Sequence, residues 1–286
     1  MSIASYAIIA IIIFFLILAW IRKLYLCYAL LLTNFIIFFI TTFYPPALKE
    51  LAFNSSYLGS YKIYTIFTAM FLHLNFLHII LNMIGLVFIG LPFEYEIGSK
   101  KFAIIYFISG FSASIAFALV EKGYAVGASG AIFGLLGAFA FMEPFKKVVV
   151  PLFMPFIIFL RLPVLYVAIF YASIETIFAF TPYSTDAIAH SAHLGGFVAG
   201  VFLAVIMKKG VKAEEKRKEK IDLEALEKMI STEKQREILE RIKNEEHEEI
   251  REAWISYLLQ QIKCPKCGGS LEFNSKIVCK KCGYRK

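Results

Sequence analysis

The sequence predicts an all-α membrane protein that crosses the bilayer several times and carries a small soluble tail. Hydrophobic residues make up 59% of the 286 residues and the mean hydropathy is +0.67, whereas an ordinary soluble domain is about 45–50% apolar. Of the 52 charged side chains, 17 lie in residues 1–207 and 35 in residues 208–286. Four of the five cysteines lie in the last 23 residues. We therefore predict four parts: an N-terminal span (1–23), a membrane core (24–210), a charged helical linker (211–262) and a small cysteine module (263–286).

Seven apolar segments have lengths near the roughly 17–25 residues that cross a bilayer as a helix. They are predicted at 4–20, 24–43, 64–91, 101–120, 126–142, 162–180 and 187–207. A signal peptide is the alternative for the first segment, but no basic residue precedes it and no small-residue cleavage site follows it. Residues 148–163 contain three prolines, which interrupt helices, so we expect an interfacial or buried connector there.

Lysine and arginine in the short connections predict the orientation, because cytosolic loops are enriched in these residues. With the N-terminus outside, eight such residues fall inside and three fall outside. The inside set is Arg22, Lys23, Lys100, Lys101, Lys146, Lys147, Lys208 and Lys209, and the outside set is Lys49, Lys62 and Lys122. The count predicts a multi-pass protein of the cell membrane with its N-terminus outside and its tail in the cytosol. It also accounts for the net charge of +8 without a nucleic-acid partner.

Ser129 is the candidate nucleophile, in the glycine-spaced apolar run VGASGAIFGLLGA. We expect it in the first turn of its helix, near the outer face. There the unpaired N–H groups and the helix dipole favour a developing oxyanion. Gly127 and Gly130 leave room for a substrate backbone to approach.

His193 is the candidate general base for Ser129. Gly196 and Gly200 follow it at the spacing that lets two membrane helices approach closely, and the helix of Ser129 has a matching pair in Gly130 and Gly134. His190 is the rival base. No acidic third member is evident, because Asp186 suits a helix N-cap and Glu175 has no assigned role, so we predict a Ser-His dyad.

His78 and Asn82 are candidate oxyanion donors. They are four residues apart and share one helical face, so both side chains can donate hydrogen bonds toward one point. His73, in the same segment, is expected to have a structural role.

The tail predicts helices followed by a metal site. Residues 211–263 carry apolar residues at helical spacing, and Thr232 to Gln235 fits a capping box. A solvated linker is the favoured reading and a dimerising coiled coil is the alternative. The pattern Cys264-x2-Cys267 and Cys279-x2-Cys282 is typical of a structural Zn²⁺ site with four thiolates. Disulfides are the alternative, which a cytosolic location disfavours.

The motifs HLNFLHIILN, GASGAIFG and AHLGG, on successive spans in this order, resemble those of the rhomboid intramembrane serine proteases. The resemblance covers residues 24–207 and implies a six-helix core, here preceded by one extra span. It implies that Ser129 attacks a peptide bond in a transmembrane substrate, with His193 as base and then acid. His78, Asn82 and the Ser129 N–H would form the oxyanion hole, and Glu94, in FEYEIG, would anchor the structure.

The sequence therefore favours an endopeptidase that cleaves membrane proteins within the lipid bilayer and needs no cofactor for catalysis. A catalytically silent relative that binds or escorts membrane proteins is the alternative, and a transporter would call for more intramembrane carboxylates or broken helices. A cytosolic protein partner for the zinc module and self-association through the linker are further expectations.

Overall fold

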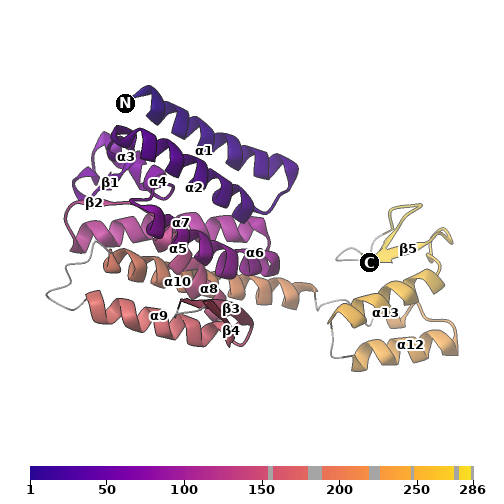
Figure 1. The fold of residues 1–286 in the computed structure, drawn as a ribbon. Helices are drawn as coiled ribbons and strands as arrows, with labels where there is room; N and C mark the ends of the chain where they lie inside the picture. The colour runs from indigo at the N-terminus through magenta and orange to yellow at the C-terminus, as the bar shows by residue number, and fades with distance from the viewer. Residues whose placement is uncertain (154–156, 180–188, 219–225, 246–247, 274–276, 285–286) are drawn as a thin grey trace. The chain divides into compact units, whose positions relative to one another are not determined.

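The computed structural model describes residues 1–153, 157–179, 189–218, 226–245, 248–273 and 277–284. These residues form two compact units, Met1–Lys208 and Lys209–Lys286. The first unit is a bundle of apolar helices, in which α1 packs beside α2 at one edge and α9 lies at the opposite edge (Figure 1). This unit confirms the predicted class of an all-α polytopic membrane protein.

Among the described residues, five helical segments are long and apolar enough to cross a membrane. They are α1 (Ile3–Arg22), α2 (Leu26–Phe43), the run Phe76–Ile97, α7 (Ser99–Val120) and the first part, His190–Lys208, of α10 (His190–Lys218). The other two predicted spans form the shorter apolar helices α8 (Ser129–Met142) and α9 (Val164–Ala179). The 14 residues of α8 extend about 21 Å, less than the roughly 30 Å of a bilayer core. A helix of this length that stands across the bilayer would have at least one end below the membrane surface.

The third span does not cover residues 64–91 as predicted. The chain instead folds as η2 (Tyr61–Tyr64), α4 (Thr65–Ala69), α5 (Phe76–Gly85), the π-helical turn η3 (Leu86–Gly90) and α6 (Leu91–Ile97). The long helix begins late because the Asn75 side chain accepts a 2.9 Å hydrogen bond from the His78 N–H and caps α5. It ends at Gly98, whose φ of +78° is favourable mainly for glycine.

In the membrane unit, two pairs of short strands depart from the purely helical expectation. β1 (Phe53–Asn54) lies between α3 (Pro45–Leu51) and η1 (Ser55–Tyr57). It pairs antiparallel with β2 (Tyr124–Ala125), in the loop that leads into α8. β3 (Lys147–Phe153) pairs antiparallel with β4 (Ile157–Pro163) where an interfacial or buried connector was expected. Pro151 is compatible with β3 because each strand of a two-stranded sheet is an edge.

Two carboxylates tie the first helices to the bundle. Glu50 of α3 accepts hydrogen bonds from the Ser2 N–H at 2.6 Å and from the Ser5 hydroxyl at 2.7 Å. The backbone bond from Ser2, followed by that from Ser5, lowers the pKa of Glu50 below its usual value. Glu94 of α6 is fully buried and accepts from the N–H groups of Leu26, at 2.6 Å, and Cys27, at 2.8 Å. Its negative charge therefore lies at the positive end of α2.

The second unit has its own hydrophobic core. It contains α12 (Glu233–Asn244), α13 (Glu248–Gln261) and the antiparallel pair β5 (Leu271–Phe273) and β6 (Ile277–Cys279). The predicted capping box is present, with the Thr232 side chain on the Gln235 N–H and the Gln235 side chain on the Thr232 N–H. Ile238, Leu239 and Ile242 of α12 pack in the same core as Cys264 and Cys279. Because α12 packs on α13 and α13 packs on β5, the apolar face of α12 is buried within this unit.

The Glu94 anchor predicts a large loss of stability in Glu94→Gln. An amide keeps the size of the side chain but presents one acceptor in place of two, so one buried N–H at the start of α2 loses its partner. Hydrogen bonds to charged groups contribute about 1.5–3 kcal/mol, and we expect a decrease of this size in the free energy of unfolding, measured in detergent. The matched control is Glu96→Gln on the same helix, which breaks only the exposed 2.7 Å ion pair with Lys146 and should cost less than about 1 kcal/mol. Equal effects of the two substitutions would contradict the anchor.

Candidate functional site

Ser129 is the first residue of α8. The first N–H groups of a helix have no partner within the helix, so Ser129 lies beside free backbone donors. The preceding turn depends on Gly127, which has a φ of +124° and donates its N–H to the Ala69 carbonyl at 2.9 Å. A Cβ at position 127 would lie 2.7 Å from His78 Nε2 and 3.5 Å from Ser129 Oγ. Gly127 therefore leaves open the space between the serine hydroxyl and the His78 ring.

The helices α8 and α10 contact each other through their glycines. A Cβ added to Gly196 would lie 2.0 Å from the Gly130 carbonyl oxygen, and one added to Gly200 would lie 1.9 Å from that of Gly134. No side chain fits between backbones at this distance. The two small-residue faces expected from the sequence thus lie against each other.

This packing brings His193 to Ser129. Nε2 of His193 lies 2.8 Å from Ser129 Oγ, within the range that a general base requires. The imidazole stacks on the ring of Phe133, one turn along α8, with 4.5 Å between ring centroids and 8° between planes. The edge of Tyr171, on α9, faces Phe133 in turn. The serine and the base are held by three neighbouring helices.

Glu175 is the residue that sequence reasoning left without a role. It lies on α9, is 7% exposed, and points its carboxylate at both histidines of α10. Oε2 lies 2.5 Å from Nδ1 of His190. Oε1 lies 2.9 Å from Nδ1 of His193, but this contact does not have the geometry of a hydrogen bond. An acidic group therefore does accompany the Ser-His pair, contrary to the expectation. The signal available in the sequence was that Glu175 is the single charged residue of an apolar span, which by itself indicates function.

His190, the rival base in the sequence, lies on the far side of this carboxylate. Its ring is buried, contacts Glu175 and stacks on Phe178 of α9 at 5.3 Å. The start of α10 is held by Glu121, at the end of α7, which accepts from the N–H of Ser191 at 3.3 Å and from its hydroxyl. Asp186, expected as an N-cap, lies outside the described residues.

The candidate oxyanion donors lie on α5, and the His78 ring is close to Ser129 at the Gly127 position. His78 accepts the Leu74 N–H at Nδ1, at 3.3 Å, so Nε2 carries the proton and is a donor beside Gly127. Asn82 is buried and donates one amide hydrogen to the His78 carbonyl at 2.8 Å, which leaves a second hydrogen for another acceptor. His73, 1% exposed, packs edge-on against the His78 ring at 5.0 Å. Neither ring nitrogen of His73 has a hydrogen-bond partner among the described residues.

The rhomboid domain model matches residues 60–210, more than half of the chain and the part that contains all of these side chains. The chain belongs to the rhomboid family. It is 33% identical over 148 residues to RHOMBOID-like protein 1 of Arabidopsis thaliana, covering 51% of this chain and 35% of that protein. It is 29% identical over 164 residues to Rhomboid-like protease 3 of Toxoplasma gondii, covering 54% and 55%.

The chain is also similar to a rhomboid-like protein whose name describes it as inactive. Inactive RHOMBOID-like protein 8 of Arabidopsis thaliana is 34% identical over 80 residues, which cover 28% of this chain and 23% of that protein. The matched region spans about half or less of the length of these relatives. Membership in the family thus establishes a multi-pass membrane protein with a rhomboid domain, while the names of these relatives include one protease and one inactive member.

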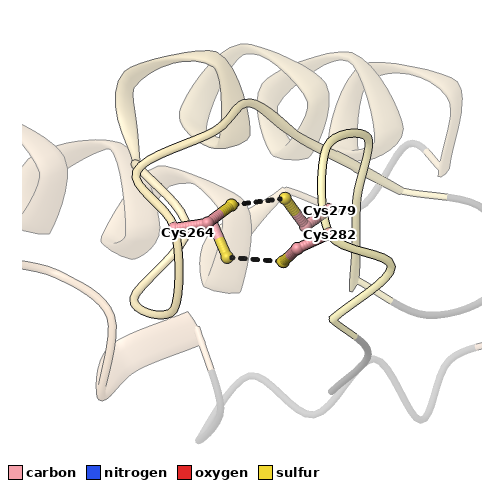
Figure 2. Close-up of side chains that lie close together, drawn as sticks. Cys264, Cys279 and Cys282 are labelled. Atoms are coloured by element: carbon pink, nitrogen blue, oxygen red, sulfur yellow. Dashed lines mark hydrogen bonds between the residues drawn. The ribbon is translucent and has the colours of Figure 1, made fainter.

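The second unit of this rhomboid holds a candidate metal site. The four sulfur atoms of Cys264, Cys267, Cys279 and Cys282 lie within 4.8 Å of one another, with 3.8 Å and 3.5 Å between the two facing pairs (Figure 2). Tetrahedral Zn²⁺ with bonds of about 2.3 Å holds its sulfurs about 3.8 Å apart, so these residues fit the ion.

The contact between α8 and α10 predicts that Gly196→Ala is destabilising. Alanine ordinarily favours a helix over glycine by about 1 kcal/mol, but here its Cβ would overlap the Gly130 carbonyl. Overpacking of this kind costs about 1–3 kcal/mol, so we expect a lower unfolding temperature in detergent. The control is Gly85→Ala, where the Cβ meets only the Ile132 side chain. If Gly196→Ala were as stable as the wild type, the two backbones would not be in contact.

The cysteine cluster predicts one zinc ion per chain. Replacing Cys264 and Cys282 together by serine should abolish zinc binding, because two of four ligands are lost. The control is Cys27→Ala, which removes the one cysteine that is buried in the membrane unit. Metal content of the purified full-length variants by mass spectrometry checks this, and a double variant that retained a full equivalent of zinc would refute the assignment.

Proposed function

We propose that this rhomboid is an intramembrane serine endopeptidase that cleaves transmembrane segments of membrane proteins. The observation that carries the proposal is the 2.8 Å contact between Ser129 Oγ and His193 Nε2 at the start of a buried helix. A serine hydroxyl becomes a nucleophile when an adjacent base can accept its proton. The relative named as a protease supports the same activity.

The reaction follows the acyl-transfer scheme of serine proteases. Ser129 Oγ bonds to the scissile carbonyl carbon while its proton passes to His193 Nε2 and the carbonyl π electrons move to the oxygen. When the oxyanion collapses, the C–N bond breaks and His193 gives the proton to the leaving amine. Water, deprotonated by His193, then hydrolyses the acyl-enzyme and restores the serine.

The oxyanion would be stabilised by the N–H of Ser129, Nε2–H of His78 and the second amide hydrogen of Asn82. Donors fixed in a water-poor site act strongly on developing charge, and losing one typically lowers kcat by about 10²–10³-fold. Glu94 would have a structural role by holding α6 to the start of α2, and His73 would support the His78 ring that it packs against. No metal ion takes part, and Zn²⁺ in the second unit has a structural role.

The placement of the site suits a substrate within the membrane. Because α8 is shorter than the bilayer core, at least one of its ends would lie beneath the surface. We assign the submerged end to Ser129, where a transmembrane helix can approach from the lipid. The counts of basic residues favour an outside N-terminus, the outer side as the entry for water, and a cytosolic tail. In this arrangement residues 24–210 form the protease core, residues 1–23 add one span, and the second unit binds a cytosolic protein partner.

The second candidate function is a silent rhomboid that binds membrane proteins without cleaving them. Its support is the similarity to a relative named inactive. The intact pair of Ser129 and His193 favours the protease.

Substitution of the pair tests the protease directly. Ser129→Ala and His193→Ala should each reduce cleavage of a single-span test substrate at least 10³-fold, because loss of a nucleophile or base removes the activated serine. The control is Ser114→Ala in α7, which should cleave at the wild-type rate. Fragments are measured by gel and mass spectrometry after reconstitution in lipid. Wild-type cleavage by Ser129→Ala would exclude this site, and a wild type that binds the substrate without cleaving it would favour the silent candidate.

A further inference from the structure

Glu175 is an intramembrane carboxylate that connects both histidines of α10, and the proposed dyad does not use it. We propose that Glu175 is a positioning residue for His193, and that His190 holds Glu175 in place. The inference rests on the proposed function, because it assigns Glu175 a role in the same reaction.

The geometry of the three side chains carries the argument. Ser129 Oγ, the His193 ring and the Glu175 carboxylate form a continuous series, with 2.8 Å at Nε2 and 2.9 Å at Nδ1. A carboxylate at Nδ1 favours the tautomer that carries its proton there, which leaves the lone pair of Nε2 for the serine proton. The Nδ1 contact does not have hydrogen-bond geometry in this state, and such contacts often tighten when substrate binds.

Burial means that a charged carboxylate at this position must be paired. Its side chain is 10% exposed, and those of His190 and His193 are 6% and 12% exposed. An isolated carboxylate in a membrane helix is costly, so intramembrane acids pair with partners. With His190 on Oε2 and His193 on Oε1, each oxygen has an imidazole neighbour and the carboxylate cannot rotate without losing both.

The aromatic rings fix this arrangement further. Phe133 stacks on His193 and Phe178 stacks on His190. Phe178 and Glu175 are three residues apart on α9 and therefore lie on one face of that helix. The helix that supplies the acid thus also supplies the ring that orients His190.

The carboxylate would act through charge and orientation and would not take the proton. As Ser129 attacks, its proton moves to Nε2 and His193 becomes an imidazolium beside an ionised Glu175. The interaction between these opposite charges is stronger in a buried site than in water. It forms only when the proton has moved, so it stabilises the transition state more than the resting enzyme.

A metal ion is the other ligand chemistry that two histidines and a glutamate can offer. Ligand bonds of about 2.0–2.2 Å at tetrahedral angles hold donor atoms about 3.4 Å apart. The contacts of 2.5 Å and 2.9 Å are shorter and correspond to direct pairing. The structure therefore favours the acid–histidine series over a metal centre.

The test measures how fast Ser129 reacts with a fluorophosphonate probe in detergent, which reports activation of the serine without a transmembrane substrate. Glu175→Gln should lower the labelling rate about 10–100-fold, less than the 10⁴-fold known for the corresponding change in a protease triad, because the resting contact is imperfect. With a peptide substrate, kcat should fall by the same factor and KM should change less than about twofold, since the interaction is made only in the transition state.

Two further variants separate this role from a purely structural one. Glu121→Gln alters a different carboxylate that anchors the same helix, at Ser191, and should label within about threefold of the wild type. Glu175→Met removes the buried charge together with its desolvation cost, so this variant should fold even if Glu175→Gln does not. Its labelling rate should be as low as the rate expected for Glu175→Gln. His193→Ala combined with Glu175→Gln should label no more slowly than His193→Ala alone.

The outcomes distinguish the inference from the proposed function. A wild type that does not react at Ser129 would overturn the protease itself. A reactive wild type with an equally reactive, folded Glu175→Gln or Glu175→Met would overturn only the role of Glu175. Equal losses in Glu175→Gln and Glu121→Gln would reduce that role to a helix anchor and also overturn the inference.

Discussion

The contact between the backbones of α8 and α10 is the constraint on which the site depends. Gly130 and Gly134 on one helix face Gly196 and Gly200 on the other at distances that exclude any side chain. In lipid there is little hydrophobic gain from pairing two apolar helices, so close van der Waals packing of small residues drives their association. The same packing fixes the distance between Ser129 and His193, which lie next to these glycines on their respective helices. The glycine contacts that hold α8 against α10 therefore also set the distance between the serine hydroxyl and the imidazole.

Buried carboxylates occur at two positions of the membrane bundle where charge is compensated. Glu94 faces two free N–H groups at the start of α2, and Glu175 faces two imidazoles on α10. An ionised group in an apolar interior must have partners, and both carboxylates have them. The partners of Glu94 are backbone N–H groups, whereas those of Glu175 are side-chain imidazoles. Backbone N–H groups cannot change protonation, so Glu94 stabilises a fixed geometry. Imidazoles can change protonation, so Glu175 lies beside two groups that are able to take up or release a proton.

The sequence predicted the class of the fold and the residues that meet at Ser129, because membrane spans and small-residue faces are local patterns with fixed periods. It did not predict the break before Phe76, since a single Asn75 side chain caps the helix inside an apolar run. It also missed the pairing of β3 with β4, because prolines in an apolar stretch indicate an interruption without indicating which partner strand is available. Glu175 could be identified as unusual from sequence alone. Its contacts with His190 and His193 depend on how α9 packs against α10, which no local pattern contains.

The described contacts also separate the two chemistries of the chain. Ser129, His193 and Glu175 lie on α8, α10 and α9 of the membrane unit, whereas Cys264 and Cys279 share a core with α12 and α13 of the second unit. The distance between Ser129 and His193 depends on glycines of the membrane unit, since Gly130 and Gly134 admit the backbone of α10. A metal on the four cysteines would join two segments of the second core that are far apart in the sequence, so its loss would first affect the packing of that core.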